Sequence, residues 1–445
     1  MNKFYVLIAL ALLHFATVRA QQSTSIMTLD DIFSHADANS RSQKAHSFAI
    51  DAAREAVQAA KNERLPQVDA SLSVSYMGNG LVTDRDFTDG MKAGIPHFGN
   101  SFALTASQIV YSGGAVSNGI RMAELAGRMA GKEKEQDRNN LRFMLAGYYT
   151  ELYKLDNRMR VYDRNIALTE ELIASAKAKY EEGTGLENDV TRYELQMETY
   201  KLERIRLRNA RTIQNYKMNK LAGIDVNTTV IPDSAQLTNA TEPSLPAGGM
   251  AVGKGTDWHS KALTSAPSLS LAGMAVEQAR LEEELIKSER RPKIALVAEE
   301  HLNGPITIDI PAINKNFNYW FVGIGATFNI ASLYKNKSRR SKAAAQTMRR
   351  QEELQLAKDN IAIAVEEAYI EYMESIDELA TLRKNVQLAE QNYNTIFTRY
   401  DNGLALATDV IEVSNTLTDA GLRLANAYAN VQFRLCKLKY TAGTL

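Results

Sequence analysis

Apolar and small polar residues alternate in two pairs of short segments, one pair in each half of the chain. In the segment PQVDASLSVSY, Val68, Leu72 and Val74 fall on one side of an extended strand, and an aspartate and three serines fall on the other. A period of two is typical of a β-strand with two different faces. The alternation predicts four strands, at about 66–78, 101–112, 292–303 and 318–330, whose apolar positions are Val68, Leu72, Val74, Phe102, Leu104, Ile294, Leu296, Trp320, Val322 and Ile324.

Each strand pair is followed by an unusually long helical pattern. All nine prolines lie outside 97–231 and 312–445, and glycine is absent from 327–402. Since both residues are unfavourable inside helices, we expect one helix from about Lys335 to Asn402, roughly 100 Å long at 1.5 Å per residue. Return helices are expected to begin near Asn188 and Thr408, which are good N-cap residues. The pattern thus predicts two long helical hairpins, at 115–222 and 335–441. Shorter helices are expected before each strand pair, at 40–63 and 267–290.

The two halves are copies of one unit. The stretch KYEEGTGLENDV at 179–190 returns as RYDNGLALATDV at 399–410, and 106–223 align on 326–443 at an offset of 220 without a gap. Internal repeats of this kind determine the architecture. We expect a first repeat at 21–223, an irregular surface connector at 224–266 near the hairpin base, and a second repeat at 267–445.

The first twenty residues, MNKFYVLIALALLHFATVRA, have a short basic start, an apolar run and small residues before the end. This pattern predicts a secretory signal peptide that is cleaved after Ala20. The apolar run is shorter than the roughly 20 residues needed to span a bilayer. No later stretch is long and apolar enough for a transmembrane helix, so a membrane role must come from the strands. Cys436 is the only cysteine, which excludes disulfides and a lipid anchor at the new N-terminus.

Charge and candidate chemistry argue against several function classes. The chain has 52 Lys and Arg against 52 Asp and Glu, whereas nucleic-acid binding is dominated by basic surface. The stretch GGMAVGK at 248–254 nearly matches a phosphate-binding loop, but Gly255 replaces the required Ser or Thr and no strand precedes it. The histidines have no ligand spacing, and no nucleophile–base pair is recognisable. We therefore expect no enzyme activity, no cofactor and no metal site.

Four amphipathic strands of about 10–12 residues have the length of membrane-spanning barrel strands, about 9–11 residues. Closed membrane barrels need about eight strands or more, and an open edge in lipid leaves backbone groups without hydrogen bonds. If these strands span a membrane, several chains must therefore share one barrel, and we expect the ten apolar positions named above to face the lipid.

The order of elements and three motifs resemble the TolC-like outer-membrane efflux family over essentially the whole mature chain. The motifs are ERLPQVDAS before the first strand, QIVYSGG after the second, and the paired Y-x-x-G-x-x-L-x-x-D-V turns. The resemblance implies a homotrimer with a twelve-stranded β-barrel, four strands per chain, in the outer membrane, continuous with an α-helical barrel across the periplasm. It also implies a passive duct of a tripartite efflux or type I secretion system, which docks a periplasmic adaptor (membrane fusion protein) connected to an inner-membrane transporter.

By that resemblance the repeated turns are the adaptor-docking tip, formed by Gly183, Leu186, Asp189, Val190, Gly403, Leu406, Asp409 and Val410. The sequence departs from the family where an acidic ring often lies just inside the tip, because EQNYNTIF has no carboxylate after Glu390. Candidate polar residues at the tunnel mouth are instead Glu181, Glu182, Asp401 and Asn394.

Two other hypotheses compete with an exit duct. A soluble periplasmic coiled-coil adaptor is expected to have one helical hairpin flanked by β-rich modules, whereas this chain has two hairpins with strands ahead of each. An envelope enzyme needs a catalytic constellation, which the sequence does not offer. We therefore favour the duct.

Overall fold

The computed structural model describes residues 23–233, 256–308 and 312–445. The chain divides into two compact units, and the division falls within its helices. The sheet unit comprises residues 48–131 and 271–355, and the hairpin unit comprises 132–270, 356–445 and the N-terminal residues to Ser47.

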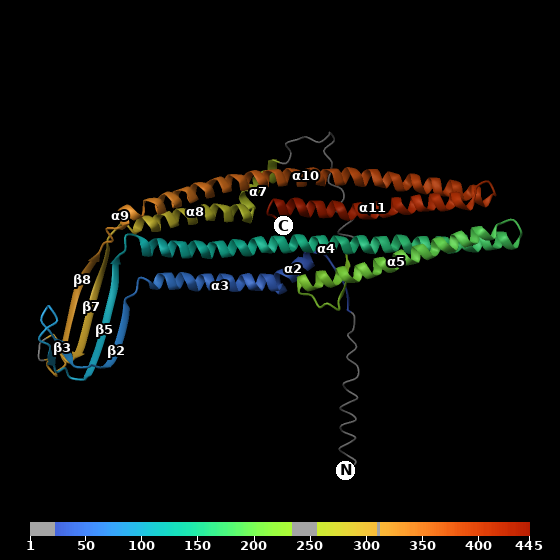
Figure 1. Cartoon of the computed structure of the whole chain (residues 1–445). Helices are drawn as coiled ribbons and strands as arrows, with labels where there is room; N and C mark the ends of the chain where they lie inside the picture. Colours follow the sequence, from blue (N-terminus) through green and yellow to red (C-terminus); the bar gives the residue numbers. More distant parts are fainter. Residues whose placement is uncertain (1–22, 234–255, 309–311) are drawn as a thin grey trace, which may run out of the picture. The chain divides into compact units, whose positions relative to one another are not determined.

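Four antiparallel strands form the sheet unit's central element (Figure 1). They are β2 (Gln67–Tyr76), β5 (Phe98–Tyr111), β7 (Lys293–Gly304) and β8 (Phe317–Thr327), in the order β2-β5-β7-β8. A small hairpin of β3 (Gly80–Val82) and β4 (Met91–Ala93), which the sequence pattern did not indicate, lies in the loop between β2 and β5. The duplicated strand–strand–helical hairpin architecture expected from the sequence is confirmed.

The register places the ten predicted apolar positions on one face of this sheet. Leu72 lies opposite Phe102, and Leu296 lies opposite Ile324. Directly opposed residues of antiparallel strands share a face. The other apolar positions lie an even number of residues from these four along their strands, so their side chains point to the same face. Glu300 is an exception on this face, because it lies opposite both Leu104 and Trp320.

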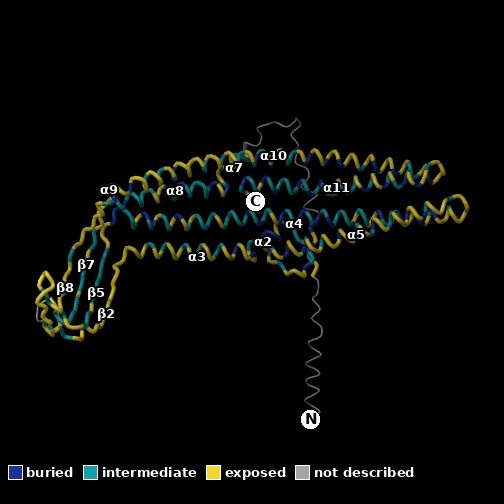
Figure 2. The backbone as a smooth tube through the Cα atoms, viewed as in Figure 1, coloured by how far each residue is buried: buried dark blue, intermediate teal, exposed yellow. Residues whose placement is uncertain are grey.

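The opposite face is the more polar one, and it includes Asp69, Ser71, Ser73, Ser101, Thr105, Glu299 and His301, together with the aromatic residues Tyr319 and Phe321 of β8. His301 Nε2 lies 2.8 Å from Glu299 Oε2, and its ring stacks on Tyr319 at 5.0 Å. β2 and β8 each have a single neighbour in the sheet, and their residues are largely exposed (Figure 2). The sheet therefore has two different faces and two unpaired edges.

Four long helices are the main elements of the two hairpins. They are α4 (Ala115–Glu181) with α5 (Glu187–Ala222), and α10 (Lys337–Asp401) with α11 (Ala407–Thr441). The shorter helices are α2 (Leu29–Asn39), α3 (Arg41–Asn62), α7 (Thr256–Ser265), α8 (Pro267–Ser288) and α9 (Ser332–Lys335). No helix of the described ranges is both long and apolar enough to cross a bilayer.

Three details differ from the sequence expectations. The second long helix begins at Lys337, because the residues before it form the separate short helix α9. The connector 224–266 is not wholly irregular, since it contains α7 and the strand β6 (Thr229–Pro232). β6 pairs in parallel with β1 (Thr24–Met27), which the sequence did not indicate. Short strands of four residues lack the periodicity that identifies longer ones. The expected signal peptide and the stretch 248–254 lie outside the described residues.

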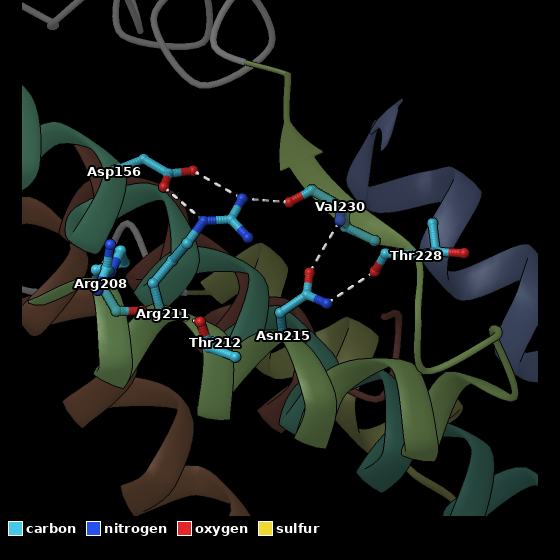
Figure 3. A network of polar contacts seen from close by, with 7 residues as sticks. All are labelled: Asp156, Arg208, Arg211, Thr212, Asn215, Thr228 and Val230. Atoms are coloured by element: carbon cyan, nitrogen blue, oxygen red, sulfur yellow. Dashed lines mark hydrogen bonds and ion pairs between the residues drawn. The ribbon is translucent and has the colours of Figure 1, made fainter. Parts of the chain in front are cut away.

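A polar network holds β6 on the first hairpin (Figure 3). Arg211 on α5 donates from Nε to Asp156 Oδ1 at 2.8 Å and from Nη2 to the Val230 carbonyl at 2.7 Å. Asn215 donates to the Thr228 carbonyl at 2.8 Å and accepts from the Val230 N–H at 2.9 Å. Side chains thus hydrogen-bond to both backbone groups of Val230 and to the Thr228 carbonyl just before β6.

The second repeat has a different contact at the same place. The positions equivalent to Asp156 and Arg211, at the offset of 220, are Ile376 and Val431, which belong to one apolar cluster. The ion pair is therefore a feature of the first repeat, whose hairpin also holds the strand β6.

Candidate functional site: the two hairpin tips

Both long helices end in the same way at the tips. Gly183 and Gly403 have a φ of +73°, in the left-handed region that favours glycine. The Gly183 N–H donates to the Tyr180 carbonyl at 2.9 Å, and the Thr184 N–H donates to the Lys179 carbonyl at 2.9 Å. Gly403 and Leu404 make the equivalent bonds in the second repeat. These are Schellman motifs, which satisfy the free carbonyls of a helix end.

The return helices begin differently from the sequence prediction. The N-cap positions are occupied by Leu186 and Leu406, not by Asn188 and Thr408, which lie inside the helices. Leucine has no acceptor for the free N–H groups of the first turn. Instead, the Asp409 carboxylate accepts a hydrogen bond from the Leu406 N–H at 3.0 Å. A carboxylate in this position also interacts favourably with the helix dipole.

The two turns are not identical in their interiors. The Gly185 N–H donates to the Lys179 carbonyl at 2.8 Å. A Cβ at Gly185 would lie 2.9 Å from the Lys179 Cβ, so this close approach requires glycine. The second repeat has Ala405 at the same place. The first turn is therefore closed more tightly than the second.

An apolar cluster lies directly behind the tips and joins the two hairpins. Val190 and Val410 belong to it and are buried, together with Tyr193, Tyr393 and Tyr400. Burial raises the pKa of Tyr193 and of Tyr393 above the ordinary value for tyrosine. Since both phenols remain neutral, the cluster holds the tips together without charge. Val190 and Val410 thus shape the tip from within.

Polar contacts add a second connection between the hairpins. The Lys179 ammonium lies 4.3 Å from the centre of the Tyr400 ring and 3.4 Å from Asp401 Oδ1. Further along, Gln196 and the hydroxyl of Tyr200 both donate to Asn415 Oδ1, at 2.8 and 2.9 Å. Lys179 was not among the sequence-predicted site residues, although the basic residue Arg399 at the equivalent position was an available signal.

A groove between the two turns is lined by residues of both repeats, among them Lys179, Asp189, Arg192 and Asp401. Leucine side chains project at its rim: Leu186 is 67% exposed, and Leu404 and Leu406 are each 69% exposed. Leu404 is a further residue that the repeat comparison missed, because Thr184 replaces it in the first copy. The tips thus place exposed leucine side chains beside charged groups of both signs.

The structure also places the four predicted mouth residues. Glu181, Glu182, Asn394 and Asp401 are all exposed. Asp401 is the one that pairs with Lys179, while the Asn394 carbonyl accepts the Thr398 hydroxyl at 2.8 Å. No group of three or more potential metal ligands occurs in the described ranges.

The tip glycines provide a direct test of this geometry. Gly183→Ala or Gly403→Ala is expected to destabilise its turn by about 1 kcal/mol, because alanine is strained at positive φ. A Cβ there meets no atom within 4 Å, so strain is the only cost. Hydrogen exchange of the Thr184 and Leu404 amides should accelerate about fivefold. Gly119→Ala is the control, since this glycine lies inside a helix with open space around it; faster exchange in the control as well would contradict the explanation.

The profile of the family described as "Outer membrane efflux protein" matches residues 32–224 and 258–444. No curated protein matches the chain significantly in sequence.

Several solved structures share the fold. The outer-membrane channel OprN is 14% identical, with a TM-score of 0.75, and the match covers 94% of this chain and 90% of OprN. VceC from Vibrio cholerae is 14% identical, with a TM-score of 0.73 over 93% of this chain and 96% of VceC. The CmeC channel of Campylobacter jejuni is 12% identical, with a TM-score of 0.72 over 94% of this chain and 85% of CmeC.

The family match spans both repeats and both hairpin tips, and it confirms the resemblance found in the sequence. The chain therefore belongs to the outer membrane efflux protein family, and the outer-membrane location expected from the sequence is confirmed.

Proposed function

We propose that three copies of this chain form a passive exit duct that docks a periplasmic adaptor and, through it, an inner-membrane transporter of a tripartite efflux or type I secretion system. The observation that carries the proposal is the four-stranded sheet with one largely apolar face, one more polar face and two unpaired edges.

Such a sheet is not stable by itself in a bilayer. Its edge strands β2 and β8 would leave N–H and C=O groups without partners in hydrocarbon, at a cost of several kcal/mol each. Pairing β2 of one copy with β8 of the next removes both edges. Three copies supply twelve strands, with lipid outside against the apolar face and water inside against the polar face.

The hairpin tips support the docking part of the proposal. Leu186, Leu404 and Leu406 are exposed, and the groove between the two turns carries both charge signs. A helical adaptor with apolar residues and complementary charges would fit this surface. Asp189 and Asp409 lie in the first turns of the two return helices beside it.

Assembly is tested with the full chain in isolated outer membranes. The expected result is a trimer that runs intact on a gel without heating, dissociates on boiling, and conducts ions after reconstitution in a planar bilayer. A monomer released in soluble form from the periplasm would contradict the proposal.

Docking is tested by cysteine crosslinking. We expect Leu186→Cys and Leu406→Cys to crosslink to a co-expressed adaptor, whereas Ile363→Cys, an exposed control in the middle of α10, does not. The native cysteine does not interfere, because burial raises the pKa of the Cys436 thiol to about 11 and keeps it protonated. Crosslinks from mid-helix positions alone, with none from the tips, would refute the contact.

A further inference from the structure

One end of the sheet carries a strong local positive charge in a chain that is neutral overall. Residues 328–350, which follow β8, contain seven Lys and Arg and no Asp or Glu. The equivalent stretch of the first repeat, 108–130, contains two Arg and one Glu. The charge therefore does not follow from the duplicated architecture, and it belongs to the second repeat alone.

The fold adds further basic residues at the same end. Lys293 begins β7 and lies opposite Thr327 at the end of β8. Glu289 accepts hydrogen bonds from Asn336 at 2.9 Å and from Arg339 at 2.7 Å, which joins the start of α10 to the segment before β7. Six of the exposed basic side chains at this end, which we name the basic collar, are Arg290, Lys293, Lys335, Lys337, Arg339 and Lys342.

Most of this charge is not neutralised within the chain. Arg339 is paired with Glu289, but the other five collar residues make no ion pair in the part of the chain that the structure describes. Five exposed cations close together repel one another, and a surface that retains them is suited to an anionic partner.

The collar begins where the apolar face of the sheet ends. That face carries Trp320, Val322 and Ile324 on β8. Beyond the strand, Phe328, Ile330, Leu333 and Tyr334 are also exposed, and Ile330 and Tyr334 are each 68% exposed. Along the chain the order is thus an apolar face, then aromatic and aliphatic side chains, then cations. The same order is found at the boundary between hydrocarbon and headgroups.

We propose that the basic collar binds the anionic headgroups of phospholipids in the inner leaflet of the outer membrane, while Ile330, Leu333 and Tyr334 insert at the level of the acyl chains. This inference rests on the proposed function, because it requires the sheet to lie in the membrane. The helices leave the sheet at the collar's end, so this is the periplasmic side. The phosphate of an acidic phospholipid supplies the negative charge that the chain itself lacks there.

The test uses the full-length protein reconstituted in phosphatidylcholine vesicles with a trace of spin-labelled phosphatidylglycerol or spin-labelled phosphatidylcholine. The fraction of immobilised label reports lipid association with the protein. We expect wild type to prefer phosphatidylglycerol by about tenfold at low salt and much less at about 0.5 M NaCl, because salt screens the attraction.

Two matched variants test whether the preference for phosphatidylglycerol comes from the collar. The triple variant Lys335→Gln, Lys337→Gln, Lys342→Gln is expected to reduce the preference to about twofold or less. The control Lys44→Gln, Lys217→Gln, Lys384→Gln removes three exposed lysines of the hairpin unit and should keep the full preference. An equal loss in both variants, or no preference in wild type, overturns the proposal.

Two further outcomes separate the alternatives. If wild type shows no preference for phosphatidylglycerol but binds inorganic phosphate, and the triple variant loses that binding, the collar is a site for free phosphate and the lipid proposal fails. Planar-bilayer conductance of the same preparation separates a failure of the collar proposal from a failure of the proposed duct. A conducting trimer without lipid preference refutes the collar alone, whereas a chain that never conducts refutes the proposed duct.

Discussion

Leu72→Arg is expected to prevent accumulation of the trimer in the outer membrane. Leu72 lies in the middle of β2 and is 74% exposed on the apolar face, opposite Phe102. An arginine at the lipid-facing midplane of a membrane barrel costs about 2–4 kcal/mol, and a trimer has three such sites. The phenylalanine directly opposite offers no charge to compensate. We expect a reduction of the heat-dissociable trimer in isolated outer membranes by at least about tenfold.

The control for this substitution is Ser71→Arg, one position earlier on the same strand. Ser71 lies on the polar face, opposite Ala103, so its replacement would face water inside the proposed barrel. Trimer levels in this variant should remain close to wild type. Equal losses in the two variants would show that the two faces do not differ in environment, and the assignment of the apolar face to lipid would be wrong.

Arg211→Ala is expected to destabilise the hairpin unit by about 3–5 kcal/mol, because it leaves a partly buried carboxylate without its partner. The side chains of Arg211 and Asp156 are only 13% and 17% exposed. The substitution also removes the donor to the Val230 carbonyl, which holds β6. Thermal unfolding of the detergent-solubilised protein measures the loss. A variant as stable as wild type would contradict the role assigned to the ion pair.

The second repeat provides the matched rescue. Asp156→Ile combined with Arg211→Val installs the apolar pair found at Ile376 and Val431. Replacement of a buried ion pair by well-packed apolar residues is often neutral, so helix packing should largely recover. The Val230 carbonyl remains without the arginine, and hydrogen exchange at β6 should stay faster than in wild type. Recovered thermal stability together with faster exchange at β6 would show that Arg211 contributes to helix packing and to the anchoring of β6 through different contacts.

The long helices and the strands were predictable because their signals are local and repeated. A proline-free and largely glycine-free stretch admits few alternatives to a helix, and strict alternation admits few alternatives to a strand. Five residues of the turn recur together at a spacing of 220 positions, and this recurrence by itself indicates a shared site. Leu186, Leu406, Asp189 and Asp409 do lie at the tips, and their docking role stays a prediction.

Other features depended on contacts between distant segments. Asn188 and Thr408 have good N-cap chemistry, yet the helices begin at Glu187 and Ala407, because the Schellman turn determines where the chain re-enters a helix. Val190 and Val410 look like part of an exposed motif, but the neighbouring hairpin buries them. The contact of Lys179 was not predictable either, because its partner, the Tyr400 ring, belongs to the other repeat.

The sequence by itself determined the duplication, the element types, the two faces of each strand and the position of the turns, since each depends on periodicity or on residues close together in the chain. Only the tertiary structure decided the pairing of β1 with β6, the order β2-β5-β7-β8 with its two open edges, and the joining of the two tips. Most of these contacts join residues that lie far apart in the chain, and their free energy comes from burial and hydrogen bonding that no local pattern records.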